Sequence, residues 1–252
     1  GTPLVGAGRA RLFETTDTLA ATGGSDSILI TGDGNNTILG GMGGDTIRTR
    51  NTTTVLGVIG TDIILGDNGV IERDAEGNHL KRIATKSQAS TGGGITDLGG
   101  ADTIEALDGT KIVLGGDLND TIDLGVVTTI MNTHTVIVDN GAISYVAMDA
   151  TGEGRALRYE TSDTLAATGG NDIIRTGDGD NVILGGMGGD TLTTKNNSVV
   201  GGLIGTDVIL GDNGFVQMDV VGDKYAQIET KSLNTTTGSA FVAELGGNDN
   251  IE

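Results

Sequence analysis

Gly40-Gly41-Met42-Gly43-Gly44-Asp45-Thr46-Ile47-Arg48 is a nine-residue unit of the form G-G-x-G-x-D-x-U-x, in which U is a large aliphatic residue. The same unit returns as Gly185-Gly186-Met187-Gly188-Gly189-Asp190-Thr191-Leu192-Thr193. Units of this form build a short strand and a tight turn, and successive turns bind calcium between them. The two copies therefore predict a solenoid with calcium at its turns.

These units lie inside a longer repeat. Residues 16–24 return as residues 162–170, a period of 146 residues. Gly-Gly-x-Asp begins at positions 23, 99, 169 and 246, so each long repeat divides into two related halves of about 73 residues. Within a half, aliphatic residues follow an Asp or Asn by two positions, in runs too short for helices. We expect an all-β parallel β-roll or β-helix solenoid, with one aliphatic column inside and small polar residues outside.

The repeat also predicts how the chain is divided. Asp67-Asn68-Gly69 is a strong turn signal, and the residues after it, 70–83, have the pattern of a β-hairpin. Equivalent hairpins are expected at 142–159 and 215–230. Because Gly1 is not a Met and both ends fall inside repeats, we expect the array to continue in both directions. The predicted segments are 1–15 (the hairpin strand that ends a preceding repeat), 16–86 (a half-repeat with hairpin), 87–161 (a second, diverged half-repeat with hairpin), 162–231 (a third) and 232–252 (the start of a fourth).

Composition restricts the partners of the chain. Its 252 residues include 45 Gly and no Cys, and the formal net charge is −19. Asp outnumbers Glu by 25 to 9. Asp favours turns and its short side chain reaches a cation held by its own loop, so a divalent cation is the expected partner. Nucleic acid and anionic membranes are excluded by charge, and no apolar stretch is long enough to span a membrane.

The chain resembles the RTX family of secreted calcium-binding repeat proteins. Residues 40–48 and 185–193 carry the resemblance in full, and residues 31–39, 115–123 and 176–184 carry it more weakly. It covers roughly 24–48, 100–123, 170–193 and the last few residues. The resemblance implies a parallel β-roll, several calcium ions in the turns, and secretion as part of a long adhesin, toxin or enzyme.

The resemblance also implies a ligand set, to which glycine carbonyls of the turns contribute. Asn36 and Asn181 take the place of the family's aspartate in the middle units, and an Asp lies three residues before each. Lys111 occupies the position of Asn36 in the second half, where its ammonium can replace a calcium, so we expect fewer ions there. Asp62 and Asp207 lie outside the family pattern and either bind calcium or cap turns, whereas capping is favoured for Asp67 and Asp212. The complete candidate set is Asp26, Asp33, Asn36, Gly41, Gly43, Asp45, Asp62, Asp102, Asp117, Asp120, Asp172, Asp178, Asn181, Gly186, Gly188, Asp190, Asp207 and Asp249.

Most of the chain is repeat, without a unique insert large enough for a catalytic site. We therefore expect no enzyme but a calcium-stiffened extracellular segment of a long adhesin, matrix filament or surface layer. Ten of the 15 basic residues lie on or beside the hairpins, either to attract acidic coils of neighbouring repeats or chains, or as a solvated mixed-charge face. The alternatives are a β-helix enzyme or enzyme-appended module acting on acidic polysaccharide, for which Lys111, His134 and Tyr145 are the only candidates, and the secretion module of a toxin or protease.

Overall fold

All regular elements in the part of the chain that the structure describes are β-strands. None of the described segments contains a helix long and apolar enough to cross a membrane. The computed structural model describes residues 10–17, 23–30, 34–49, 60–86, 99–107, 109–125, 133–146, 155–163, 168–177, 179–194, 205–220, 222, 224–231 and 248–251.

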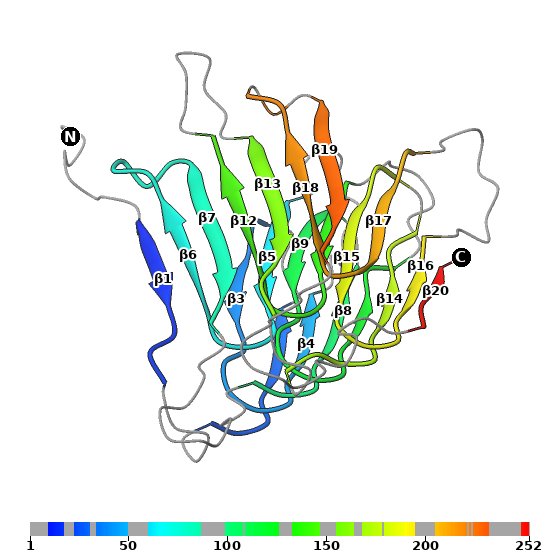
Figure 1. The fold of residues 1–252 in the computed structure, drawn as a ribbon. Coiled ribbons are helices and arrows are strands. Elements are labelled where there is room, and N and C mark those ends of the chain that lie inside the picture. Colours follow the sequence, from blue (N-terminus) through cyan, green and yellow to red (C-terminus); the bar gives the residue numbers. More distant parts are fainter. Residues whose placement is uncertain are drawn as a thin grey trace, which may run out of the picture.

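Two parallel sheets form the solenoid, and each runs along the rod in sequence order (Figure 1). The base sheet consists of β2 (Ser27–Ile30), β4 (Thr46–Thr49), β8 (Thr103–Ala106), β10 (Thr121–Asp123), β14 (Ile173–Arg175), β16 (Thr191–Thr193) and β20 (Asn250–Ile251). The middle sheet consists of β3 (Thr37–Leu39), β5 (Thr61–Leu65), β9 (Thr110–Leu114), β11 (His134–Ile137), β15 (Val182–Gly186) and β17 (Val208–Asp212).

A third, antiparallel sheet is built by the hairpins and is called the hairpin sheet below. The predicted hairpins are present, and their strands join into one continuous sheet along the front of the rod (Figure 1). Its strands are β1 (Leu12–Glu14), β6 (Gly69–Arg73), β7 (Leu80–Thr85), β12 (Gly141–Tyr145), β13 (Ala156–Thr161), β18 (Gly214–Met218) and β19 (Tyr225–Thr230).

The three sheets grow at the same rate along the rod. The chain passes twice between base and middle sheet and then makes one hairpin, so the stretch from Ser27 to Thr85 adds two strands to each sheet. The stretches 103–161 and 173–230 do the same. Because neighbouring strands are separated by about 4.8 Å in every kind of sheet, two coils and one hairpin occupy the same length. The division at 16–86, 87–161, 162–231 and 232–252 stays a prediction.

The apolar core has two layers, and the expectation of a single aliphatic column is wrong. One layer lies between base and middle sheets, where Ile47 and Ile64 are fully buried. The other lies between middle and hairpin sheets, where Leu65 packs with Ile71 and Ile83. Successive side chains of a strand point to opposite faces, so a middle strand that is covered on both sides supplies both layers.

The basic residues of the hairpins pair with acidic residues of the same sheet. Arg158 Nε lies 2.8 Å from Glu160, and Lys231 Nζ lies 3.7 Å from the same carboxylate. Arg158 also lies over the ring of Phe215, 3.7 Å from its centre. These contacts favour the interpretation of the outer face as a solvated surface of mixed charge.

Candidate metal site

Seven aspartates form a column along one edge of the base sheet. Each directly precedes a base strand, and parallel pairing brings them into register. From the second aspartate of the column onward, the Oδ1 atom of each accepts a hydrogen bond from the backbone N–H of the aspartate before it, at 2.6–3.0 Å. This Asp column consists of Asp26, Asp45, Asp102, Asp120, Asp172, Asp190 and Asp249.

The second carboxylate oxygen of the five central aspartates has no hydrogen-bond partner. The Oδ2 atoms of Asp45, Asp102, Asp120, Asp172 and Asp190 are buried without one, and each of these residues is at most 2% exposed. A buried ionised carboxylate is costly unless it is paired or coordinates a metal. The repetition at five successive coils indicates a common missing partner that is positively charged.

Backbone carbonyl oxygens lie beside four of these orphan oxygens, those of Asp45, Asp102, Asp120 and Asp190. A Cβ atom on Gly66 would lie 2.0 Å from Asp102 Oδ2 and 2.6 Å from the carbonyl oxygen of Gly115. The same holds at Gly40, where a Cβ would meet Asp45 Oδ2 at 2.4 Å and the Gly66 carbonyl oxygen at 2.1 Å. Each cradle therefore combines a carboxylate oxygen with a carbonyl oxygen of the next coil, which is the donor set that calcium prefers.

The turns that carry the cradles require glycine for a second reason. Gly41 and Gly43 have φ angles of +108° and +106°, and Gly186 and Gly188 repeat them at +105° and +115°. Glycine adopts this region without steric cost. In the second half Leu118 takes the position of Gly43 and has a φ of +72°.

Crowding and burial make the Asp column reluctant to ionise when no cation is bound. Burial, together with the neighbouring charge of Asp45 and against the effect of a backbone hydrogen bond, raises the pKa of Asp102 to about 7. Burial likewise raises the pKa of Asp172 to about 8 and that of Asp190 to about 7. Burial, and then the charges of the two neighbouring carboxylates, raise the pKa of Asp120 well above the ordinary value of 3.8.

A protein-family comparison decides what kind of turn this is. The family model described as the RTX calcium-binding nonapeptide repeat (4 copies) matches residues 13–47 and 159–192. The chain carries RTX calcium-binding repeats. No curated protein and no solved structure matches the chain. The matched segments contain Asp26, Asp45, Asp172 and Asp190, and the other members of the Asp column lie in the same register.

The opposite turns of the solenoid carry a second column, of mixed chemistry. Parallel pairing of the middle strands aligns its members, and the same hydrogen-bond rule holds: the Asp62 and Asp207 carboxylates accept from Asn36 and Asn181. Asp62 also forms a buried ion pair with Lys111. This mixed column consists of Asn36, Asp62, Lys111, His134, Asn181 and Asp207.

His134 is a neutral member of the mixed column. The ring Nδ1 of His134 accepts a hydrogen bond from the backbone N–H of Lys111 at 3.2 Å. The backbone N–H of His134 donates to Asn181 Oδ1 at 3.3 Å. Burial lowers the pKa of His134 to about 4, and the positive charge of Lys111 acts in the same direction.

The aspartates of two Asp-Asn-Gly turns, Asp67 and Asp139, cap turns of the next coils. Asp67 Oδ1 accepts the N–H of Gly100 at 2.8 Å, and its Oδ2 accepts that of Asp117 at 2.6 Å. Asp139 binds the N–H groups of Gly170 and Met187 in the same way. Capping was the favoured role for Asp67, whereas Asp139 was missed, although its Asp-Asn-Gly turn repeats that at 67–69.

The remaining predicted ligands lie elsewhere. Asp117 is buried inside a turn, where its carboxylate accepts a hydrogen bond from Asn140 rather than joining the Asp column. Asp33 and Asp178 lie outside the described residues. Over the part of the chain that is described, no three acidic or histidine side chains gather around one point.

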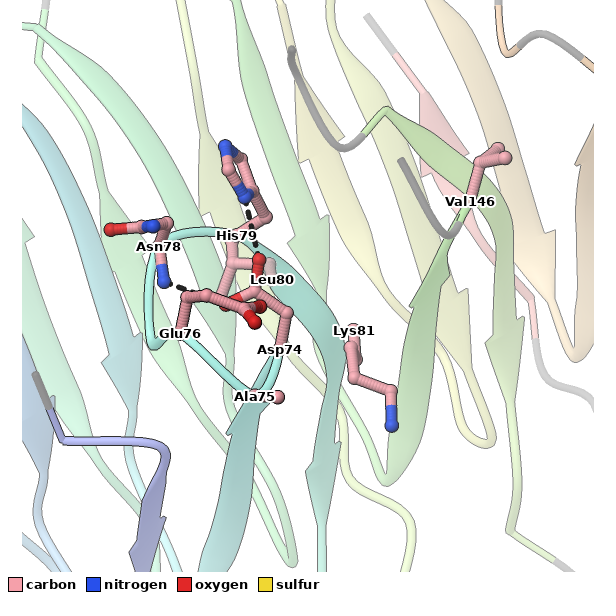
Figure 2. Close-up of a pocket in the computed structure, with 8 residues that line it drawn as sticks. All are labelled: Asp74, Ala75, Glu76, Asn78, His79, Leu80, Lys81 and Val146. Atoms are coloured by element: carbon pink, nitrogen blue, oxygen red, sulfur yellow. Dashed lines mark hydrogen bonds and ion pairs between the residues drawn. The ribbon is translucent and has the colours of Figure 1, made fainter. Parts of the chain in front are cut away.

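A separate hollow of about 460 Å³ lies at the tip of the first hairpin (Figure 2). Asp74 accepts hydrogen bonds from the Asn78 backbone at 2.7 Å and from His79 at 2.6 Å. The His79 hydrogen bond lowers the pKa of Asp74. The carboxylate thus closes the hairpin turn, which accounts for its position.

Proposed function

We propose that this chain is a calcium-stiffened rod segment of an extracellular structural protein, such as an adhesin, a matrix filament or a surface layer. The observation that carries the proposal is the set of five orphan Oδ2 atoms in the Asp column, four of which lie beside a backbone carbonyl oxygen of the next coil. Calcium between successive coils would supply the missing partner and offset the repulsion along the column.

Calcium makes such a rod conditional on its surroundings. A preformed site rarely exists in the unfolded chain, so the free energy of calcium binding contributes to folding. Calcium is abundant outside cells, and the RTX repeat is typical of secreted proteins. The chain would then remain unfolded before export and become rigid afterwards.

The enzymatic alternative loses two of its three candidate residues. Lys111 and His134 are each only 1% exposed and lie in the mixed column, so a polysaccharide cannot contact them from the surface. Tyr145 is partly buried beneath the hairpin sheet, among apolar side chains. The continuous sheets favour a structural role over a catalytic one.

The test is a calcium titration followed by far-UV circular dichroism and reversed with a chelator. We expect a cooperative gain of β signal. Asp120→Asn should raise the calcium midpoint about tenfold, the equivalent of 1.4 kcal/mol for one lost charged ligand. Asp123→Asn, three residues later in β10 and partly exposed beside Arg175, is the matched control and should leave the midpoint unchanged. A β signal already complete in chelator, and equal midpoints for both variants, would refute the calcium site.

Self-association is tested separately. Sedimentation velocity at high protein concentration, with and without calcium, should show calcium-dependent association through the edges of the sheets. A chain that stays monomeric in calcium would retain the rod role and lose the role in assembly.

A further inference from the structure

The mixed column follows the hydrogen-bond rule of the Asp column at every step but one. In both columns the side chain of one coil accepts the backbone N–H of the coil before it. Lys111 cannot do this, because an ammonium group has no lone pair. It donates backwards instead, and its Nζ lies 3.0 Å from Asp62 Oδ2.

The ion pair between Lys111 and Asp62 is inside the protein. The two side chains are 1% and 2% exposed, respectively. Lysine is almost never fully buried unless it is paired, and this one lies directly across from its partner in the register of β5 and β9. Asn36 donates two hydrogen bonds to the other oxygen of Asp62, at 3.0 Å and 2.8 Å, so both oxygens of that carboxylate have partners.

The two columns therefore treat the same pair of coils differently. In the Asp column, the coils that carry Asp62 and Lys111 begin at Asp45 and Asp102, which are neighbours and each have an orphan Oδ2. In the mixed column, the carboxylate of Asp62 has a positive neighbour and no orphan oxygen. The positive charge that the Asp column lacks is supplied in the mixed column by the side chain of Lys111.

We propose that Lys111 is a built-in cation, whose ammonium takes beside Asp62 the place that a calcium ion takes between successive carboxylates of the Asp column. Asp62 is then not a calcium ligand. This inference rests on the proposed calcium sites of the Asp column and concerns a different turn.

One consequence is that these coils need calcium at the turns of the Asp column but not at the Asp62–Lys111 turns of the mixed column. The pairing of β5 with β9 keeps its counter-charge in chelator, whereas the Asp column loses its own. A buried charge pair also costs more when either partner is removed alone than when both are replaced together. Replacing either Lys111 or Asp62 alone should therefore destabilise the fold more than replacing both together.

The test counts bound calcium ions per folded chain by equilibrium dialysis, with wild type, Lys111→Asp and Lys86→Met compared. Lys111→Asp places a second carboxylate next to Asp62, as in the Asp column, and should bind one ion more than wild type. Lys86→Met removes a partly exposed lysine paired with Glu14 and should bind the same number as wild type. An unchanged count for a folded Lys111→Asp chain would overturn the proposal.

A second variant keeps the proposal testable if Lys111→Asp does not fold. The double substitution Asp62→Asn with Lys111→Met removes both charges and keeps an acceptor for Asn36. It should fold in calcium and bind as many ions as wild type. Loss of one ion would show that Asp62 is a calcium ligand and would overturn the proposal. The number of ions bound by wild type tests the Asp column alone, and zero ions would refute the proposed function. The difference in bound ions between wild type and the variants tests the role of Lys111 separately.

Discussion

Acid should partly replace calcium in folding this chain. The perturbation is a change from pH 8 to pH 5 in the presence of a chelator. A carboxylate whose pKa is higher in the folded than in the unfolded state contributes stability that is fully present below the unfolded value and is lost as pH rises through the folded value. For Asp102 the folded pKa is about 7 and the ordinary value is 3.8. The stabilising effect of protonation is therefore lost mainly between pH 4 and pH 7.

The magnitude follows from the same two values. The difference between 3.8 and about 7 corresponds to roughly 4 kcal/mol at neutral pH for this one group, at 1.36 kcal/mol for each pH unit. Asp172 and Asp190 act in the same direction, with pKa values of about 8 and about 7. Since the groups interact, their effects do not add, but even one of them is a large fraction of the stability of a typical domain.

The assay is urea denaturation of the chelated chain, followed by circular dichroism at several pH values. The free energy of unfolding should rise by several kcal/mol between pH 8 and pH 5. The calcium-loaded chain is the control, because bound calcium keeps the carboxylates ionised and should make its stability nearly independent of pH in this range. A chelated chain equally stable at pH 8 and pH 5 would refute the account of the Asp column as a row of strained carboxylates.

Three substitutions test single features of the turns. Gly66→Ala would place a Cβ atom 2.0 Å from Asp102 Oδ2 and should weaken calcium binding at least tenfold, whereas Gly24→Ala, with nothing within 4 Å, should titrate like wild type. Leu118→Gly relieves a φ of +72° and should stabilise the loaded chain by about 1 kcal/mol, seen as a Tm higher by a few degrees; an unchanged or lower Tm would contradict the strain. Asp67→Ala leaves two buried N–H groups without acceptors and should cost roughly 3 kcal/mol in urea denaturation with saturating calcium, and a loss below about 0.5 kcal/mol would contradict the capping role.

The nine-residue unit predicted the parallel solenoid, and the aspartates that it marks lie in register in the Asp column. Asn36 and Asn181, which were assigned to the same position as these aspartates, lie in the mixed column at the opposite turns. A glycine turn followed by Asp and an aliphatic residue fixes a strand start, and parallel stacking then aligns every such Asp. The equivalence of Lys111 with Asn36 was also predicted from spacing, and the structure places both in the mixed column, Lys111 opposite Asp62. These features are local, so the sequence shows them directly.

The second core layer was not predicted, although the sequence contains a signal for it. Ile63, Ile64 and Leu65 form a continuous apolar run, and such a run is typical of a strand covered on both faces. The aliphatic residues of the hairpins, such as Ile71 and Ile83, were assigned to strands without a surface to cover. The structure shows that the outward-facing side chains of the middle sheet pack against the aliphatic side chains of the hairpin sheet, because the three sheets add strands at the same rate along the rod.

The capping aspartates show the same limit more sharply. Asp67 binds backbone groups 33 and 50 residues away, in two later coils. An Asp-Asn-Gly sequence is sufficient for a turn on local grounds, so nothing in it points to those partners. Contacts of this kind depend on the stacking register, which is a property of the assembled solenoid.

The two columns together explain how a solenoid of this type can differ in its need for metal from one coil to the next. The rule that a side chain accepts the backbone N–H of the preceding coil is met by Asp120, by Asn181 and by His134. Carboxylate, amide and neutral imidazole can therefore exchange at these positions while the backbone contact is kept, and only the charge of the column changes. Lys111 breaks the rule and supplies the opposite charge. Calcium dependence is thus set by the charge at each turn, on a stacking geometry that the hydrogen bonds and the aliphatic layers maintain.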